Sequence, residues 1–180
     1  GSDPGRVDYG QLYVSRFPVL RKAVARIAEV RPEGYNTFLR DNAYWLNDYA
    51  LFMAEKDAHG GQAYTTWEED IRMHRRDALV SERVRLEKDV DVYIGIQYLF
   101  FMQGKKMGEY AHAHGVSLIG DVPIYVSPDS SDIWGSPEFF QLDEELKPTG
   151  VAGCPPDAFA ADGQLWGNPL YDWDRLREDG

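Results

Sequence analysis

The stretch that decides the fold is Val116-Ser117-Leu118-Ile119-Gly120-Asp121, a short apolar run with β-branched residues that ends in a carboxylate. It follows a long segment of helical character, and a helix that leads into a fully buried strand is typical of parallel α/β sheets. In an α/β barrel, ligand-facing residues lie at the carboxyl ends of the strands, which is the position of Asp121. The sequence therefore predicts an α/β protein with a strand over residues 116–121.

The part of the chain before this stretch, residues 1–114, is predicted to be mainly helical. Apolar residues recur at helical spacing over residues 16–30, with charged residues on the other side. A second helix is expected after Asp41, which can cap it, and His59-Gly60-Gly61 should end it. The stretch Thr66-Trp67-Glu68-Glu69 fits a capping box and predicts the start of a short third helix.

Residues 81–114 carry conflicting local signals. Apolar β-branched residues alternate with polar or small ones between Asp89 and Gln97, which is the period-two pattern of a strand. The charged stretch before this segment and residues 103–113 after it favour helix, and no turn signal lies between them. We therefore expect one long helix that ends at Gly115, and the alternative is a strand over residues 89–97.

Residues 115–180 are predicted to form the strand and then a long loop. The chain after Pro123 is rich in Pro, Gly, Asp and aromatic residues and lacks sustained periodicity. Short helical turns are expected near residues 131–134 and 137–140. A loop of this length inside a compact domain usually has a function.

Composition excludes several classes of protein. The hydrophobic fraction of 43% and the charged fraction of 27% are those of an ordinary globular protein, and no run of apolar residues is long enough to span a membrane. A net charge of −11 would repel a phosphate backbone, so no nucleic-acid partner is expected. The single cysteine, Cys154, cannot form an internal disulfide, and no signal peptide is recognisable, so we expect a cytoplasmic location. No cofactor is expected, nor a metal, because His112 and His114 lack a third ligand at suitable spacing.

Several strings of residues occur in the order and spacing of one enzyme family. They are IGDVPIYV at 119–126, DSSDIW at 129–134, VAGCPPD at 151–157 and GQLWGNPLYDW at 163–173. Together they resemble the 4-α-glucanotransferases of glycoside hydrolase family 77, the amylomaltase or disproportionating-enzyme type. Further similar strings at 45–52 and 97–100 extend the resemblance to nearly the whole chain.

The resemblance implies a fold and an activity. The family has an elaborated (β/α)8 barrel, of which residues 1–114 would be a helical subdomain with barrel-flanking helices. Residues 115–180 would be the third barrel strand and a long active-site loop over the substrate cleft. The implied reaction transfers 1,4-α-glucan segments between maltooligosaccharides by a retaining mechanism, which requires two carboxylates about 5 Å apart. The family's nucleophile lies in an Arg-x-Asp-His motif that is absent here, so the chain is expected to be an internal section without catalytic residues and inactive by itself.

The resemblance also assigns substrate-binding residues. Asp121 matches the carboxylate that ends the third strand near the scissile sugar, and Trp166 matches an aromatic platform on the acceptor side, where an indole can cover a glucose ring. Gln164 and Asn168 flank that platform with amides that suit sugar hydroxyls. Asp157 and Phe159 match the start of a mobile loop over the active site.

Each of these residues also has a purely structural interpretation. Asp121 could cap a neighbouring turn, Trp166 could pack in the core, and the amides of Gln164 and Asn168 could pin a loop backbone. Many family members have Tyr where this chain has Ala158, which removes a possible contact from the mobile loop. Structural roles are favoured for two further groups. Asp129 and Asp132 are expected in turns or caps, and core packing is expected for Trp45, Tyr49, Phe52, Tyr98, Phe100 and Phe101.

Two other functions remain possible at this stage. An autonomous carbohydrate-binding module would use the same aromatic and acidic residues, although such modules are usually β-sandwiches and helical periodicity dominates here. A non-catalytic interaction domain could preserve the family's shape. A section of a barrel would leave strand edges unpaired and apolar faces uncovered, so we expect self-association or partial disorder of the last third.

Overall fold

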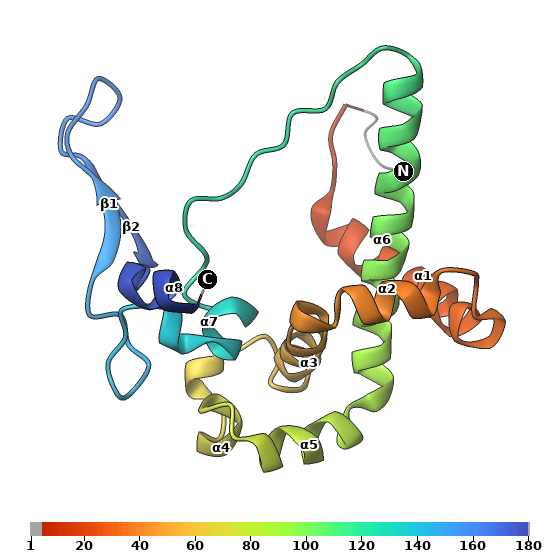
Figure 1. Cartoon of the computed structure of the whole chain (residues 1–180), viewed down its shortest axis with the longest axis horizontal. Helices are drawn as coiled ribbons and strands as arrows, with labels where there is room; N and C mark the ends of the chain where they lie inside the picture. Colours follow the sequence, from red (N-terminus) through yellow and green to blue (C-terminus); the bar gives the residue numbers. More distant parts are fainter. Residues whose placement is uncertain (1–4, 180) are drawn as a thin grey trace. The chain divides into compact units, whose positions relative to one another are not determined.

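The computed structural model describes residues 5–179, which form helices and one small sheet (Figure 1). The elements are α1 (Tyr9–Val30), α2 (Tyr35–Asp41), α3 (Ala43–Ala58), η1 (Tyr64–Thr66), α4 (Glu69–Arg72), α5 (Arg76–Arg85), α6 (Glu87–Ala113), α7 (Ser131–Gly135), η2 (Pro137–Phe139), β1 (Val151–Cys154), β2 (Gln164–Pro169) and α8 (Trp173–Asp179). Helix therefore dominates, as the sequence predicts.

The chain divides into two compact units that alternate along the sequence. The first unit comprises the chain up to Ala50 together with Leu86–Leu118, and the second comprises Leu51–Arg85 and Ile119–Gly180. Helix α3 contributes its first half to the first unit and its second half to the second. The division into residues 1–114 and 115–180 expected from the sequence remains a prediction.

The first unit is built on the contact between α1 and α6. Val24 and Ile27 of α1 are buried, as are Val90 and Ile94 of α6. The helices approach closely because Gly95 has no side chain, and a Cβ there would lie 2.5 Å from Val24 Cγ1. The result is a close-packed helix crossing, in which a change of even one methyl group is felt.

Aromatic residues of α2 and α3 complete the first unit. The ring of Tyr98 lies 4.9 Å from that of Tyr35 and 5.5 Å from that of Phe38, measured between centroids. Tyr98 is buried, as predicted for a core residue, but Phe100 and Phe101 are exposed, which corrects the prediction for those two. Helical spacing places Tyr98 and Phe101 on neighbouring positions, yet Phe101 remains 44% exposed while its ring contacts those of Phe38 and Trp45.

The second unit is built around Trp134 of α7, whose exposed fraction is 1%. Its ring packs against Phe52 of α3 and Trp67, with centroid separations of 5.7 and 6.0 Å. Its indole Nε1 donates a hydrogen bond of 2.9 Å to the carbonyl oxygen of Ile71 in α4. One side chain therefore fixes three helical segments and satisfies its own buried polar group.

A fully buried acid, Glu55, also lies in the second unit. Its Oε2 accepts a 3.3 Å hydrogen bond from Arg85, which also pairs with Glu82. Burial, followed by a hydrogen bond with Glu82, raises the pKa of Glu55 to about 7. His59 links this group to the surface, because its Nε2 lies 2.8 Å from the carboxylate of Glu68.

The sheet of the second unit is a two-stranded antiparallel hairpin of β1 and β2 (Figure 1). Gly153 pairs with Leu165, and the register shifts between Val151 and Gly153. A Cβ at Gly153 would lie 2.5 Å from the carbonyl oxygen of Gln164, so only glycine fits. This hairpin is not predictable from the local sequence, because the residues between the strands are too many for a tight-turn signal.

The predicted strand over residues 116–121 is not formed. The segment has no strand pairing, and Ile119 has an exposed fraction of 98%. A strand is defined by hydrogen bonds to a neighbour, and no neighbouring strand accompanies this segment in the described part of the chain. The segment is apolar, but its residues are exposed and not buried as predicted.

Most helix predictions are confirmed, whereas two capping predictions are wrong. Residues 89–97 lie inside α6, which excludes the strand alternative, and Gly115 follows the helix with a φ of 72°. Asp41 ends α2 and does not cap α3. The Thr66 hydroxyl donates to the carbonyl oxygen of Ala63, so no capping box forms with Glu69.

The loop predicted after residue 123 contains α7 and η2 as expected, and α8 in addition.

Within residues 5–179 no helix has the length and apolar character needed to cross a membrane.

The helix crossing in the first unit predicts that alanine lowers the free energy of unfolding at one glycine of α6 and raises it at another. Gly95→Ala should lower the free energy of unfolding, because overpacking costs about 1–3 kcal/mol and outweighs the helix-propensity gain of about 0.5–1 kcal/mol. Gly104→Ala should raise it by about 0.5–1 kcal/mol, since a Cβ at that position meets nothing within 4 Å. Urea denaturation followed by circular dichroism measures both, and a stabilising Gly95→Ala would contradict the described crossing.

Candidate functional site

The candidate site lies on strand β2 of the second unit, which carries three of the predicted residues. Gln164 and Trp166 are two positions apart in the strand and share a face. The indole Nε1 of Trp166 donates a 3.0 Å hydrogen bond to Oε1 of Gln164. Trp166 is 46% exposed, so its ring is oriented by a neighbour while one part remains open to solvent.

Tyr125 extends the aromatic surface beside Trp166. The two ring centroids are 6.2 Å apart, and Tyr125 stacks on Tyr171 at 6.0 Å with an interplanar angle of 15°. Burial, with a smaller effect from Asp132, raises the pKa of Tyr171, so its hydroxyl stays protonated at neutral pH. Neither Tyr125 nor Tyr171 was predicted as a site residue, although both lie inside the motif strings at 119–126 and 163–173.

Asn168 and Asp157 have structural partners within the second unit. The side-chain amide of Asn168 donates a 2.7 Å hydrogen bond to the carbonyl oxygen of Val126, which is the loop-pinning role considered from the sequence. Asp157 Oδ1 accepts from the backbone amides of Phe159 and Ala160, both at 2.8 Å. This carboxylate closes a turn, and the ring of Phe159 lies at that turn with an exposed fraction of 96%.

Asp121 lies in the exposed segment that precedes Tyr125. Its side chain is open to solvent and makes no hydrogen bond or ion pair with the described residues. The structure therefore brings Gln164, Trp166 and Tyr125 together by direct contact. Asp121 lies four positions before Tyr125 in the sequence, and it is not part of this group of contacts.

Lys56 and Asp129 position the segment that carries Tyr125 and Val126. The ammonium of Lys56, near the end of α3, donates to the carbonyl oxygens of Gly61 and Gln62 and to Asp129 Oδ2 at 2.6 Å. The other oxygen of Asp129 accepts from the backbone amide of Tyr64 at 3.1 Å. The carboxylate of Asp129 therefore makes tertiary contacts and does not close a local turn as predicted, because both of its oxygens bond residues far away in the sequence. It ties residues 126–130 to α3.

The described residues contain no group of three or more histidine, cysteine or acidic side chains arranged to hold a metal ion. The site instead offers an exposed indole and the side-chain amide of Gln164. An indole can cover the apolar C–H face of a hydroxyl-rich ring while a neighbouring amide bonds its hydroxyls.

Comparison with known families identifies the chain. The family model described as 4-alpha-glucanotransferase matches residues 2–180. The chain belongs to the 4-alpha-glucanotransferase family. Among its relatives in that family are the 4-alpha-glucanotransferase of Thermus thermophilus, 44% identical over the whole chain, and the chloroplastic/amyloplastic 4-alpha-glucanotransferase of Solanum tuberosum, 38% identical over 97% of it.

A solved structure of this family has the same fold. The amylomaltase from Streptococcus agalactiae in complex with acarbose superimposes with a TM-score of 0.90 at 40% identity, over 99% of this chain. The chain spans 37% of that structure, 37% of the Thermus protein and 31% of the Solanum protein. It therefore corresponds to about a third of a 4-alpha-glucanotransferase.

The Lys56–Asp129 ion pair yields a prediction. Lys56→Met should lower the free energy of unfolding by about 2 kcal/mol, because it leaves a partly buried carboxylate without its cation. Lys105→Met is the control, since Lys105 makes only a 3.9 Å exposed pair with Glu109, and should change stability by less than about 0.5 kcal/mol. Equal effects of the two substitutions in chemical denaturation would show that the pair does not hold residues 126–130.

Proposed function

We propose that this chain is a section of a 4-alpha-glucanotransferase and forms one wall of its substrate cleft. The complete enzyme would transfer 1,4-α-glucan segments between maltooligosaccharides by a retaining mechanism. The observation that carries this proposal is the half-exposed indole of Trp166, held by Gln164 and flanked by Tyr125 in a chain of this family.

The geometry of β2 suits a glucose ring. The open part of the Trp166 indole would cover the apolar face of the sugar, and Gln164 Nε2 would donate to a hydroxyl while its Oε1 holds the indole. Asn168 would act indirectly, since its amide is bound to Val126. Phe159 would cover the substrate from the turn that Asp157 closes, and Asp121 would contact the sugar near the bond that is broken.

The exposed segment before Tyr125 supports a section of a (β/α)8 barrel. Ile119, Val122 and Ile124 are largely exposed, which is costly for a run of aliphatic side chains. In a closed barrel this segment would pair with neighbouring strands from outside the chain and bury these residues. The same exposed residues would drive self-association of the isolated chain.

The catalytic carboxylates are proposed to lie in parts of the enzyme outside this chain. Retaining transfer needs a nucleophile and an acid/base, and no Arg-x-Asp-His sequence occurs in these 180 residues. The alternative of an autonomous carbohydrate-binding module receives less support, because such modules are usually β-sandwiches and this chain is mainly helical. The cytoplasmic location remains a prediction from the sequence.

The first test measures sugar binding to the chain. Titration calorimetry with maltotriose and with acarbose should detect millimolar binding, and Trp166→Ala should weaken it at least tenfold, a change of about 1.4 kcal/mol. Tyr44→Ala is the matched control, because Tyr44 is an exposed aromatic residue of the other compact unit. Binding that survives Trp166→Ala, or that Tyr44→Ala removes equally, would count against the β2 site.

The second test concerns catalysis. The purified chain incubated with maltotriose should release no glucose and form no longer maltooligosaccharides, because it lacks both reacting carboxylates. The full-length Thermus thermophilus relative, assayed in parallel by chromatography, shows that the assay detects transfer. Turnover by the purified chain would place the nucleophile within these residues and overturn the proposal.

A further inference from the structure

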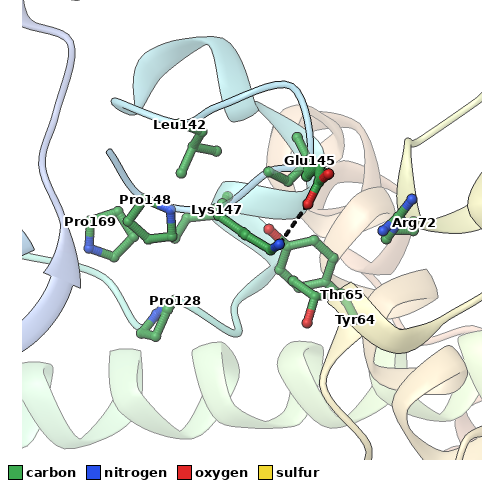
Figure 2. A pocket seen from close by; sticks show the side chains of 11 residues that line it. Tyr64, Thr65, Arg72, Pro128, Leu142, Glu145, Lys147, Pro148 and Pro169 are labelled. Atoms are coloured by element: carbon green, nitrogen blue, oxygen red, sulfur yellow. Dashed lines mark hydrogen bonds and ion pairs between the residues drawn. The ribbon is translucent and has the colours of Figure 1, made fainter. Parts of the chain in front are cut away.

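A pocket of about 220 Å³ lies in the second unit, and its lining does not include Gln164, Trp166 or Tyr125 (Figure 2). Prolines and aliphatic side chains line one part of it, including Pro128, Pro148 and Leu142. Arg72, Lys147, Glu145, Tyr64 and Thr65 supply its polar part. The pocket thus combines an apolar wall with hydrogen-bond donors.

Arg72 is the unusual member of this lining. Its Nε is buried and makes no hydrogen bond, and its guanidinium makes no ion pair with the described residues. Nearby Arg75, by contrast, pairs with Glu69 at 3.0 Å and with Asp70. A buried guanidinium nitrogen without an acceptor is costly, because the desolvation of a charged donor is not compensated. This donor is suited to an acceptor that comes from a ligand.

The backbone around Arg72 is fixed. It is the last residue of α4, and the preceding residue, Ile71, is buried and accepts the hydrogen bond of Trp134. Its guanidinium therefore projects from a rigid base.

Lys147 is presented by a rigid turn. Asp143 Oδ1 accepts from the backbone amides of Glu145 and Lys147, both at 2.9 Å, so this carboxylate is used within the turn. The ammonium of Lys147 donates to Glu145 at 2.5 Å, as the dashed line in Figure 2 shows. This hydrogen bond raises the pKa of Lys147, while the nearby charge of Arg72 acts in the opposite direction. Arg72 and Lys147 therefore influence each other here, and the carboxylates of Glu145 and Asp143 also act on Lys147.

Tyr64 adds a neutral donor. It is 1% exposed, and burial, with a smaller effect from Asp129, raises its pKa to about 12. Its hydroxyl therefore keeps its proton at neutral pH. Figure 2 shows the Tyr64 ring between Lys147 and Thr65.

We propose that this pocket binds a small organic phosphate that carries one six-membered ring. The phosphoryl group would accept hydrogen bonds from Arg72, Lys147 and Tyr64, because it has three acceptor oxygens and Arg binds such groups through paired donors. The ring would lie on the proline and leucine wall. The volume fits this size, since a cavity of about 150 Å³ holds benzene and drug-sized ligands need about 300 Å³ or more.

Titration calorimetry of the chain with four probes tests the proposal. Phenyl phosphate and glucose 6-phosphate each carry the anion on a ring, inorganic phosphate lacks the ring, and glucose lacks the anion. At least one ring phosphate should bind tenfold or more tightly than inorganic phosphate, and which of the two binds better identifies an aromatic or a sugar ring. Glucose should not bind at this pocket. If neither ring phosphate binds, or if inorganic phosphate binds equally well, the proposal is overturned.

Two variants and a control locate the binding. Arg72→Met keeps the aliphatic stem and should weaken the tighter ring phosphate at least tenfold, whereas Arg75→Met, three positions away and outside the pocket lining, should leave it unchanged. Lys147 is exposed, so Lys147→Met should fold normally even if Arg72→Met does not, and it should weaken binding several-fold. Circular dichroism checks the fold of each variant. Unchanged affinity in a folded Arg72→Met or Lys147→Met protein would overturn the proposed site.

Discussion

The ion pair between Lys56 and Asp129 holds together the part of the molecule that carries the proposed function. The ammonium of Lys56 donates hydrogen bonds to two backbone carbonyls and one carboxylate. These bonds link the end of α3 and residues 126–130 into one framework. The carbonyl oxygen of Val126 accepts a hydrogen bond from the side-chain amide of Asn168, which connects this framework to β2. Tyr125 and Trp166 meet because both of their backbones are fixed in this way.

The sequence predicts the helices well because their information is local. Periodic apolar residues specify α1, α3 and α6, and the conflict over residues 89–97 is resolved by the helix-favouring residues on both sides. The β1–β2 hairpin was missed because its register depends on a glycine at 153 that lets Gln164 approach, a long-range fit that no local pattern reveals. For residues 116–121 a strand was predicted that does not form. Their composition indicates a strand, but strand formation requires a partner.

The candidate site was predictable only through the family motifs. Neither periodicity nor composition marks Trp166 or Gln164, and the residue pattern alone left packing roles open for both. The structure brings these two together and shows backbone roles for Asn168 and Asp157, which a sequence motif does not distinguish from contact with substrate. Tyr125 was overlooked because an aromatic residue in an extended segment gives no sign of which ring it will meet.

The buried carboxyl of Glu55 makes the second unit sensitive to acidity. Its pKa in the folded chain, about 7, lies above the ordinary value of 4.5, so the folded state holds this proton more tightly than the unfolded state. The stabilisation is complete below about pH 4.5 and is lost as the pH rises through about 7. Burial lowers the pKa of His59, but its bonds to Glu68 and Glu55 raise that pKa by a larger amount, so the net shift is upward. This upward shift also stabilises the folded state at lower pH. Mild acid therefore favours the packed arrangement of α3 and α5, and mild alkali loosens it.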